Sequence, residues 1–191
     1  MEDMVGSSKK LDHPFFCRPA IELAPELLGK ILVRRLRGRE FRARIVETEA
    51  YVGPHDLACH ASKGRTGRTE VMFGQAGHAY VYLIYGMYEM LNIVASEEED
   101  PQAVLIRAAE PLDNWKADLS GPGKLTRALR ITLADNRLDL TGDKIFLLGD
   151  QAYQPRIVKT QRVGVDYARD WKDAMLRFLD ANSSAVSKPR P

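Results

Sequence analysis

Two strand-like stretches of this 191-residue chain carry side chains that a packed core would not use. The first, residues 44–51, contains Glu47, Glu49 and Tyr51 among apolar residues. The second, residues 80–88, holds four tyrosines and leads to Asn92. A carboxylate can act as an acid or a base, tyrosine rings can stack on a flat ring, and an amide can select among such rings. Together these groups could bind a purine-like ring and cleave a bond beside it.

Strand alternation places Ile45, Glu47, Glu49 and Tyr51 on one face of the first stretch. A glutamate is ionised near neutral pH and could therefore take a proton from water. The alternative is that both glutamates pair with nearby arginines on a solvated face. Arg107 interrupts an otherwise apolar strand, and a buried arginine needs an acidic partner. Glu49 or Glu47 could supply it, which would join the three residues in one polar cluster.

The tyrosine-rich stretch has the pattern of a hairpin around Gly86. Alternation puts Tyr82 and Tyr85 on opposite faces, so Tyr82 could line a pocket while Tyr85 projects outward. An aromatic wedge at a hairpin tip could displace a base from a DNA stack, although amphipathic tyrosines in a half-buried sheet are the alternative. His60 could form hydrogen bonds in a pocket, and the alternative is an exposed or core histidine. Asn92 lies in an apolar strand, where a buried amide needs partners or faces a ligand.

The apolar pattern also predicts the elements that must position these groups. Strands are expected at 31–36, 41–52, 80–85, 87–96, 102–110, 144–148 and 157–165, with a long loop region at 53–77. Helices are expected at 24–28, with Pro25 at the first helical position, at 120–129 and at 170–177. Strands that follow one another without regular helical crossovers predict an α+β fold with a mainly antiparallel sheet. The length fits a single compact domain at 13–181 between flexible termini at 1–12 and 182–191.

Composition limits the class of protein. Hydrophobic residues make up 45% and charged residues 28%, as expected for a globular protein, and the net charge is only +2. A basic cluster at 30–44 could be a phosphate-binding face or a solvated hairpin. Two cysteines exclude a disulfide framework and a cysteine-rich zinc site. Because no apolar run could span a bilayer, a cytoplasmic protein without membrane contact is expected.

Over about residues 14–180 the sequence resembles the alkyladenine (3-methyladenine) DNA glycosylase family. The motifs that carry the resemblance are LLGKILVR at 27–34, RIVETEAY at 44–51, YVYLIYGMY at 80–88, NI at 92–93, VLIRA at 104–108 and SGPGKL at 120–125. The resemblance implies one domain around a curved antiparallel sheet with flanking helices and a protruding β-hairpin. It also implies a monomer, without metal or cofactor, that acts on double-stranded DNA.

The implied activity is base-excision DNA repair by a monofunctional glycosylase. Such an enzyme flips damaged purines such as 3-methyladenine, 7-methylguanine, hypoxanthine and ethenoadenine out of the duplex and hydrolyses the N-glycosidic bond. The resemblance makes Glu49 the general base that activates water and Arg107 the residue that helps to hold this water. Glu47, on the same predicted face, is left as a structural bystander.

The same resemblance assigns the residues that contact DNA. Tyr51, His60 and Tyr82 match positions that sandwich the flipped base and form hydrogen bonds with it. Asn92 matches the residue that sterically disfavours the exocyclic amine of guanine. Tyr85 matches the side chain that fills the gap in the duplex.

Contacts to the DNA backbone are a further expectation. Lys124, near a predicted helix N-terminus, could contact a phosphate, and Arg65 and Arg68 in the long loop are further candidates. A competing interpretation is a non-catalytic nucleic-acid-binding module that resembles the C-terminal domain of methionyl-tRNA formyltransferase. A zinc deaminase is a weaker one, because the H-x-E…P-C-x-x-C pattern is absent.

Overall fold

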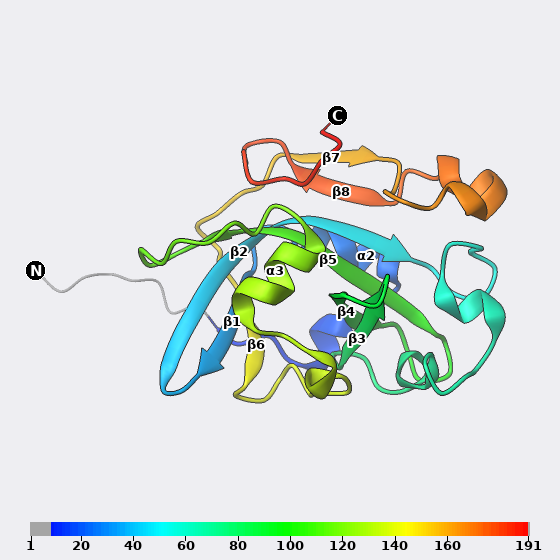
Figure 1. The fold of residues 1–191 in the computed structure, drawn as a ribbon, viewed down its shortest axis with the longest axis horizontal. Helices are drawn as coiled ribbons and strands as arrows, with labels where there is room; N and C mark the ends of the chain where they lie inside the picture. The colour runs from blue at the N-terminus through cyan, green and yellow to red at the C-terminus, as the bar shows by residue number, and fades with distance from the viewer. Residues whose placement is uncertain (1–8, 191) are drawn as a thin grey trace, which may run out of the picture.

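Eight strands of the computed structural model form one curved sheet, and residues 9–190 are the part of the chain that the structure describes (Figure 1). The strands are β1 Ile31–Leu36, β2 Arg39–Tyr51, β3 Ala79–Ile84, β4 Tyr88–Ala95, β5 Gln102–Pro111, β6 Ile145–Leu148, β7 Ile157–Thr160 and β8 Arg177–Asp180. Their order is β3-β4-β5-β2-β1-β6, with β8 paired to both β2 and β7. Every pairing between them is antiparallel, which confirms the predicted α+β fold with its antiparallel sheet.

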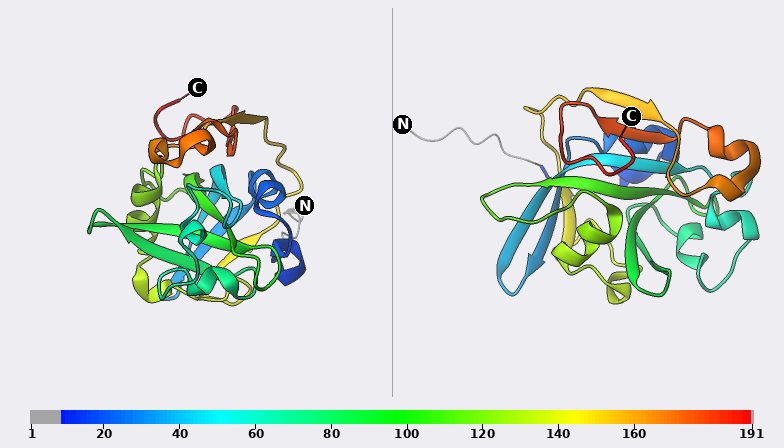
Figure 2. Two further views of the ribbon diagram at one scale, coloured as in Figure 1. Left: turned by 90° about the vertical axis from the view of Figure 1, so that its right-hand side faces the viewer. Right: turned by 45° about the horizontal axis from the view of Figure 1, so that its top comes forward.

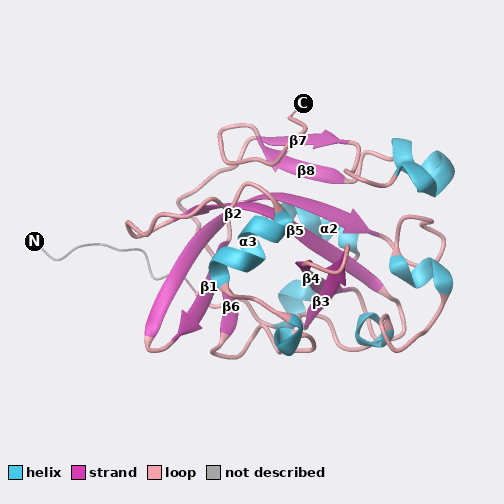
Figure 3. Ribbon diagram, in the orientation of Figure 1, coloured by secondary structure: helices cyan, strands magenta, loops and turns pink. Residues whose placement is uncertain are grey.

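Strand β2 organises the sheet because it is long enough to have different neighbours along one edge. Its first half pairs with β1, its residues 47–49 pair with β8, and β5 follows its other edge. The sheet therefore curls around β2 (Figure 3).

Two shifts in the β2–β5 register interrupt the predicted alternation. Ile45 pairs with Ala109, Glu47 with Ala108 and Thr48 with Ile106, so Val46 on β2 and Arg107 on β5 are each an extra residue. Such bulges redirect side chains. The prediction that Ile45 shares a face with Glu47 is consequently wrong: Ile45 packs in the main core, and Val46 packs in a separate cluster.

The helices are short and lie against the sheet. They are α1 His13–Phe16, α2 Ala20–Glu26 and α3 Pro122–Leu129, with 3-10 turns η1 His60–Lys63, η2 Glu70–Phe73, η3 Leu133–Asp135 and η4 Asp166–Asp173. Helix α2 packs on β2 and β5, and α3 packs on β4 and β5. Their apolar side chains, such as Leu23 and Leu125, belong to the main core.

Three predicted elements differ from the structure. The helix expected at 24–28 begins earlier, at Ala20, so that Pro25 lies inside its last turn instead of at its first position, although proline has no N–H to donate within a helix. The strand expected at 157–165 ends at Thr160. The helix expected at 170–177 is present only as the end of the 3-10 turn η4, which Arg169 interrupts with a φ of 52° and which ends at Asp173, and Arg177 begins β8. Pairing of this strand with β2 and β7 overrides its local sequence pattern.

The predicted hairpin around Gly86 consists of β3 and β4 and projects from the body of the molecule (Figure 2, left). Its turn places Tyr85 at φ 53° and Gly86 at φ 70°, and the N–H of Met87 donates to the carbonyl of Ile84. Two successive residues with positive φ match the twist of a hairpin, but the conformation is uncommon for a tyrosine. The side chain of Tyr85 is 83% exposed at this tip.

The structure describes the two termini that were predicted to be flexible to different extents. Residues 1–8 of the N-terminal segment lie outside the described residues, and Lys10 forms a bridge to Leu148. In the C-terminal segment Val186 and Ser187 are buried against the domain. The predicted domain limits stay a prediction, but this part of the tail is packed.

Candidate active site

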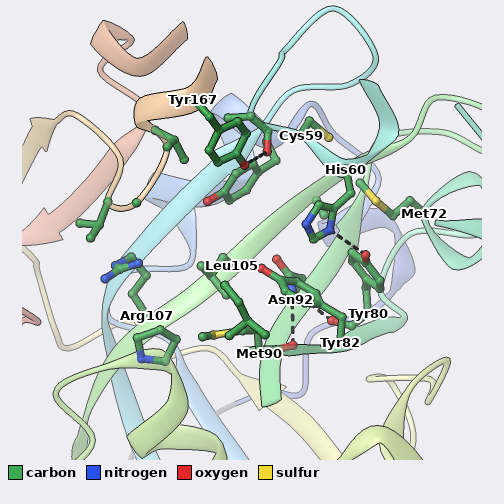
Figure 4. Close-up of a pocket in the computed structure, with 18 of the residues that line it drawn as sticks. Cys59, His60, Met72, Tyr80, Tyr82, Met90, Asn92, Leu105, Arg107 and Tyr167 are labelled. Atoms are coloured by element: carbon green, nitrogen blue, oxygen red, sulfur yellow. Dashed lines mark hydrogen bonds between the residues drawn. The ribbon is translucent and has the colours of Figure 1, made fainter. Parts of the chain in front are cut away.

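A cavity of about 370 Å³ opens between the projecting hairpin, the end of β2 and the segment that follows β7 (Figure 4). This volume is in the range of small-molecule sites. Tyrosine, histidine, cysteine and methionine side chains line much of it, together with Asn92 and Arg107. Among the predicted residues, the cavity brings together Tyr51, His60, Tyr82, Tyr85, Asn92 and Arg107.

His60 and two tyrosines form the aromatic wall. The His60 ring lies 4.6 Å from that of Tyr82 at an interplanar angle of 75°, and its Nδ1 is 2.8 Å from the Tyr80 hydroxyl. Burial, with the positive charges of Arg68 and Lys63, lowers the pKa of His60 to about 4. His60 is therefore a neutral hydrogen-bonding group at neutral pH.

Tyr51 stands at the end of β2 and connects the cavity to the acidic group behind it. Its hydroxyl donates to Glu49 Oε2 at 2.8 Å, and the guanidinium of Arg162 lies 4.9 Å from its ring centroid. Burial and the charge of Glu49 raise the pKa of Tyr51 well above its ordinary value. The phenol accordingly stays protonated and remains a donor to Glu49.

Glu49 is fully buried and is not itself among the lining residues, but it contacts three that are. Oε2 accepts from Tyr51, Oε1 accepts from the backbone N–H of Val163 at 2.7 Å, and Arg107 Nη1 lies 3.4 Å from Oε1. A carboxylate offers about four lone-pair positions, so these contacts leave room for one more donor. The alternative interpretation, a solvated acidic face, is wrong, because neither Glu47 nor Glu49 is exposed.

Arg107 joins the two glutamates, as predicted. Its Nε donates to Glu47 Oε1 at 2.8 Å while Nη1 lies beside Glu49, and it also lines the cavity. The bulge at Arg107 aims the side chain toward both carboxylates instead of toward the main core.

Asn92 lies on β4 at the base of the cavity and is only 3% exposed. Its Nδ2 donates to the backbone carbonyls of Tyr80 at 3.2 Å and Met90 at 3.5 Å. Since only the amide nitrogen can donate to carbonyls, these contacts fix the orientation of the side chain. The Asn92 Oδ1 atom is consequently the group that remains for the cavity.

The candidate backbone contacts lie outside the cavity lining. Lys124 Nζ is 2.8 Å from Asp118, and Arg65 binds Glu70 and Glu99. Arg68 lies 4.8 Å from the ring centroid of Tyr82. All three are at the surface, so their predicted roles stay predictions.

The basic cluster at 30–44 is largely paired with acids. Arg34 contacts Asp135, Arg35 contacts Glu40, Arg42 contacts Asp113 and Arg44 contacts Asp150. The β1–β2 turn that carries part of the cluster is at the far end of β2 from Tyr51 (Figure 1). This cluster therefore contributes no side chain to the cavity lining.

Sequence reasoning missed one wall of the cavity. Val163, Gly164, Val165 and Tyr167 line it, and Arg162 forms a buried ion pair with Asp56 while lying over Tyr51. Local pattern predicted part of this segment as strand. In the sequence, Val163–Gly164–Val165 directly after Arg162 is only a weak signal for a cavity wall. The contacts of Arg162 with Asp56 and Tyr51, which bring this segment to the cavity, are visible only in the structure.

Within residues 9–190, no three His, Cys, Asp or Glu residues gather in a group that could hold a metal ion. None of the helices in this range is both long and apolar enough for a transmembrane span.

Residues 14–184 match the family model described as methylpurine-DNA glycosylase (MPG). A protein of Legionella pneumophila (strain Lens) named "Putative 3-methyladenine DNA glycosylase" is 48% identical, over 94% of this chain and 99% of its own length. Proteins with the same name from Methanocella arvoryzae and Myxococcus xanthus are 47% and 46% identical, each over 95% of this chain and over 97% and 95% of their own lengths.

Proposed function

Because the chain belongs to the methylpurine-DNA glycosylase family, we propose that it removes damaged purines from double-stranded DNA in base-excision repair. The observation that carries the proposal is the ion pair of Glu49 and Arg107 directly behind a cavity with aromatic walls. The cavity receives a flipped purine, and the ion pair receives the water that attacks its sugar. Alkylated, deaminated and etheno purines are the proposed substrates.

Glu49 is the proposed general base. The water is held between Glu49 and Arg107, its oxygen bonds to C1′ of the deoxyribose, and its proton passes to Glu49. The C1′–N bond breaks, and its electron pair leaves with the purine. General-base action of this kind contributes roughly 10²- to 10⁴-fold to a rate. No lysine is among the cavity-lining residues in the described part of the chain, which supports hydrolysis without strand cleavage.

Tyr51, Tyr82 and His60 are proposed to hold the flipped base. Each tyrosine ring already has a guanidinium near it, from Arg162 and Arg68, and neither guanidinium is part of the lining. The cavity side of the rings is thus free to stack on a purine, and a cationic purine gains about 0.5–2 kcal/mol per well-placed ring. Neutral His60 supplies a hydrogen bond without adding a positive charge.

The remaining roles concern selection and the duplex. The fixed side chain of Asn92 occupies the space that the exocyclic amine of guanine would need. Tyr85, on its projecting turn, fills the gap that the flipped nucleotide leaves. Lys124 and Arg65 contact the DNA backbone after exchanging their acidic partners for phosphates, and Arg68 is a further backbone contact. We further propose that the protein acts in the cytoplasm as a monomer and without a cofactor.

The test is the substitution Glu49→Gln, which keeps the size of the side chain and removes its basicity. Single-turnover release of hypoxanthine and 3-methyladenine should fall by roughly 10²- to 10⁴-fold, while binding of the same duplexes in a gel-shift assay persists. The exposed Glu98→Gln is the matched control and should behave as wild type. Release at the wild-type rate by Glu49→Gln would show that Glu49 is not the base, and binding of every lesion without turnover by wild type would favour a binding module.

A further inference from the structure

The C-terminal segment reaches the polar cluster behind the cavity through Ser187. Both the backbone N–H and the hydroxyl of Ser187 contact Glu47, the N–H at Oε2 and the hydroxyl at Oε1, at 2.5 Å and 2.8 Å. Ser187 is 3% exposed and 140 residues distant from Glu47 in sequence. A segment that looks like a loose end by composition therefore buries a serine inside the domain.

Arg177 holds this segment in place. It donates from Nε to Glu47 Oε1 at 2.7 Å and from Nη2 to the carbonyls of Ser187 and Pro189 at 3.2 Å and 2.9 Å. The cluster of Glu47, Arg107, Arg177 and Ser187, called the Glu47 cluster below, thus joins β2, β5, β8 and the C-terminal segment.

Within the Glu47 cluster, the hydroxyl of Ser187 also accepts from Arg107 Nη2 at 3.0 Å. Arg107 therefore has two fixed points on the side away from the cavity: Nε on Glu47 and Nη2 on Ser187. A guanidinium is planar and rigid, so two fixed nitrogens determine the direction of the third. That third nitrogen, Nη1, is the one that lies 3.4 Å from Glu49.

We propose that Ser187 is a positioning residue that directs Arg107 Nη1 toward Glu49 and the attacking water. The inference rests on the proposed function, since it assigns Ser187 a part in the hydrolysis. Ser187 touches neither DNA nor water in this role, and it acts only through Arg107. The C-terminal segment is in this way a functional part of the site.

The substitution Ser187→Ala tests this role, because it removes both hydroxyl contacts and keeps the backbone contact to Glu47. Single-turnover excision of ethenoadenine should slow by roughly 10- to 100-fold, since a hydrogen bond to a charged group is lost and the reacting groups shift. Base flipping, followed by the fluorescence of ethenoadenine, should be unchanged. A role limited to stability would instead lower flipping and the melting temperature together.

Three companion variants separate positioning from general damage. Ser187→Thr keeps the hydroxyl and should restore most of the rate, and Ser184→Ala, at an exposed position of the same segment, should have no effect. In an Arg107→Lys background, Ser187→Ala should cause no further loss, because a lysine side chain lacks the second nitrogen through which Ser187 acts. A wild-type rate for Ser187→Ala, or the same loss in the Arg107→Lys background, would overturn the proposal.

A readout independent of activity distinguishes this proposal from the proposed function. In nitrogen-15 NMR spectra the Nη resonances of Arg107 should be separate in wild type and should merge in Ser187→Ala, as the guanidinium gains rotation. If wild type releases no purine from any lesion, the proposed function fails, and the NMR spectra still decide whether Ser187 fixes Arg107. Unchanged Arg107 resonances in Ser187→Ala would refute the positioning role by themselves.

Discussion

Glu47 and Glu49 lie two residues apart on β2 and are both fully buried, but their surroundings differ. Glu47 accepts from Arg107, Arg177 and twice from Ser187. Glu49 accepts from Tyr51 and from the backbone of Val163, and Arg107 lies beside it at 3.4 Å. Glu47 therefore accepts four hydrogen bonds, three of them at Oε1, and Glu49 accepts two, so the second carboxylate has more acceptor capacity left.

The pKa of Glu47 reflects the partners around it. Burial raises it, but Arg107, the backbone N–H of Ser187 and Arg177 together outweigh burial, so that the pKa lies below its ordinary value of 4.5. An ionised carboxylate that already accepts four hydrogen bonds can hold cations in place and has less capacity to bind a water. The comparison teaches that two equal acids on one strand acquire different tasks from the partners that the fold brings to each.

The largest effect on stability is expected for Glu47→Gln. It removes the charge that Arg107 and Arg177 share, and breaking a buried pair in this way costs about 3–5 kcal/mol. Urea denaturation gives the free energy of unfolding of each variant. Glu47→Gln should lower it strongly, and Glu49→Gln should lower it less. An equal loss for the two variants would mean that the two carboxylates do not differ in the way described.

The lowered pKa of His60 in the cavity predicts how the free energy of unfolding depends on pH. Its pKa of about 4 lies below the ordinary 6.5, so the unfolded chain takes up a proton between these values and the folded chain does not. The free energy of unfolding should therefore fall as the pH drops from 6.5 to 4, by up to roughly 3 kcal/mol, and should not change from this source above 6.5. His60→Gln removes the group and is the control.

Two measurements check the His60 prediction. Denaturation at about pH 7 and about pH 5 should give a difference that shrinks in His60→Gln, and an NMR titration of the His60 ring should show a midpoint near pH 4. A midpoint near 6.5 would mean that the cavity does not exclude the charged form of His60.

Much of the site could be predicted from local pattern. Strand alternation and Gly86 predict a hairpin with Tyr85 near its tip, and the structure has Tyr85 at the exposed tip, although Tyr82 and Tyr85 both line the cavity. The buried pairing of Arg107 follows from the cost of an unpaired arginine in an apolar strand, and it is confirmed.

The rest depended on contacts between distant segments. Strict alternation could not reveal the bulges at Val46 and Arg107, because a bulge arises from how two strands pair and not from one strand alone. The contact of Ser187 with Glu47 likewise requires β8 to return beside β2. Neither a composition rich in Ser and Pro nor a short apolar run carries that information.

The smallest expected effect concerns selectivity and belongs to Asn92. Asn92→Ser shortens the side chain at the base of the cavity, so release of undamaged guanine should rise by roughly 10-fold, as for other pockets enlarged by a small group. Release of hypoxanthine, which lacks the exocyclic amine, should change less, and the ratio of the two rates in one duplex series measures the effect.

Because Asn92 also donates to the carbonyl of Tyr80, the melting temperature must be followed in the same variant. A gain on guanine with only a small loss of stability would show that Asn92 acts in the cavity, where it limits which purines are released. A large loss of stability with no gain on guanine would instead give Asn92 a structural role like that of Glu47.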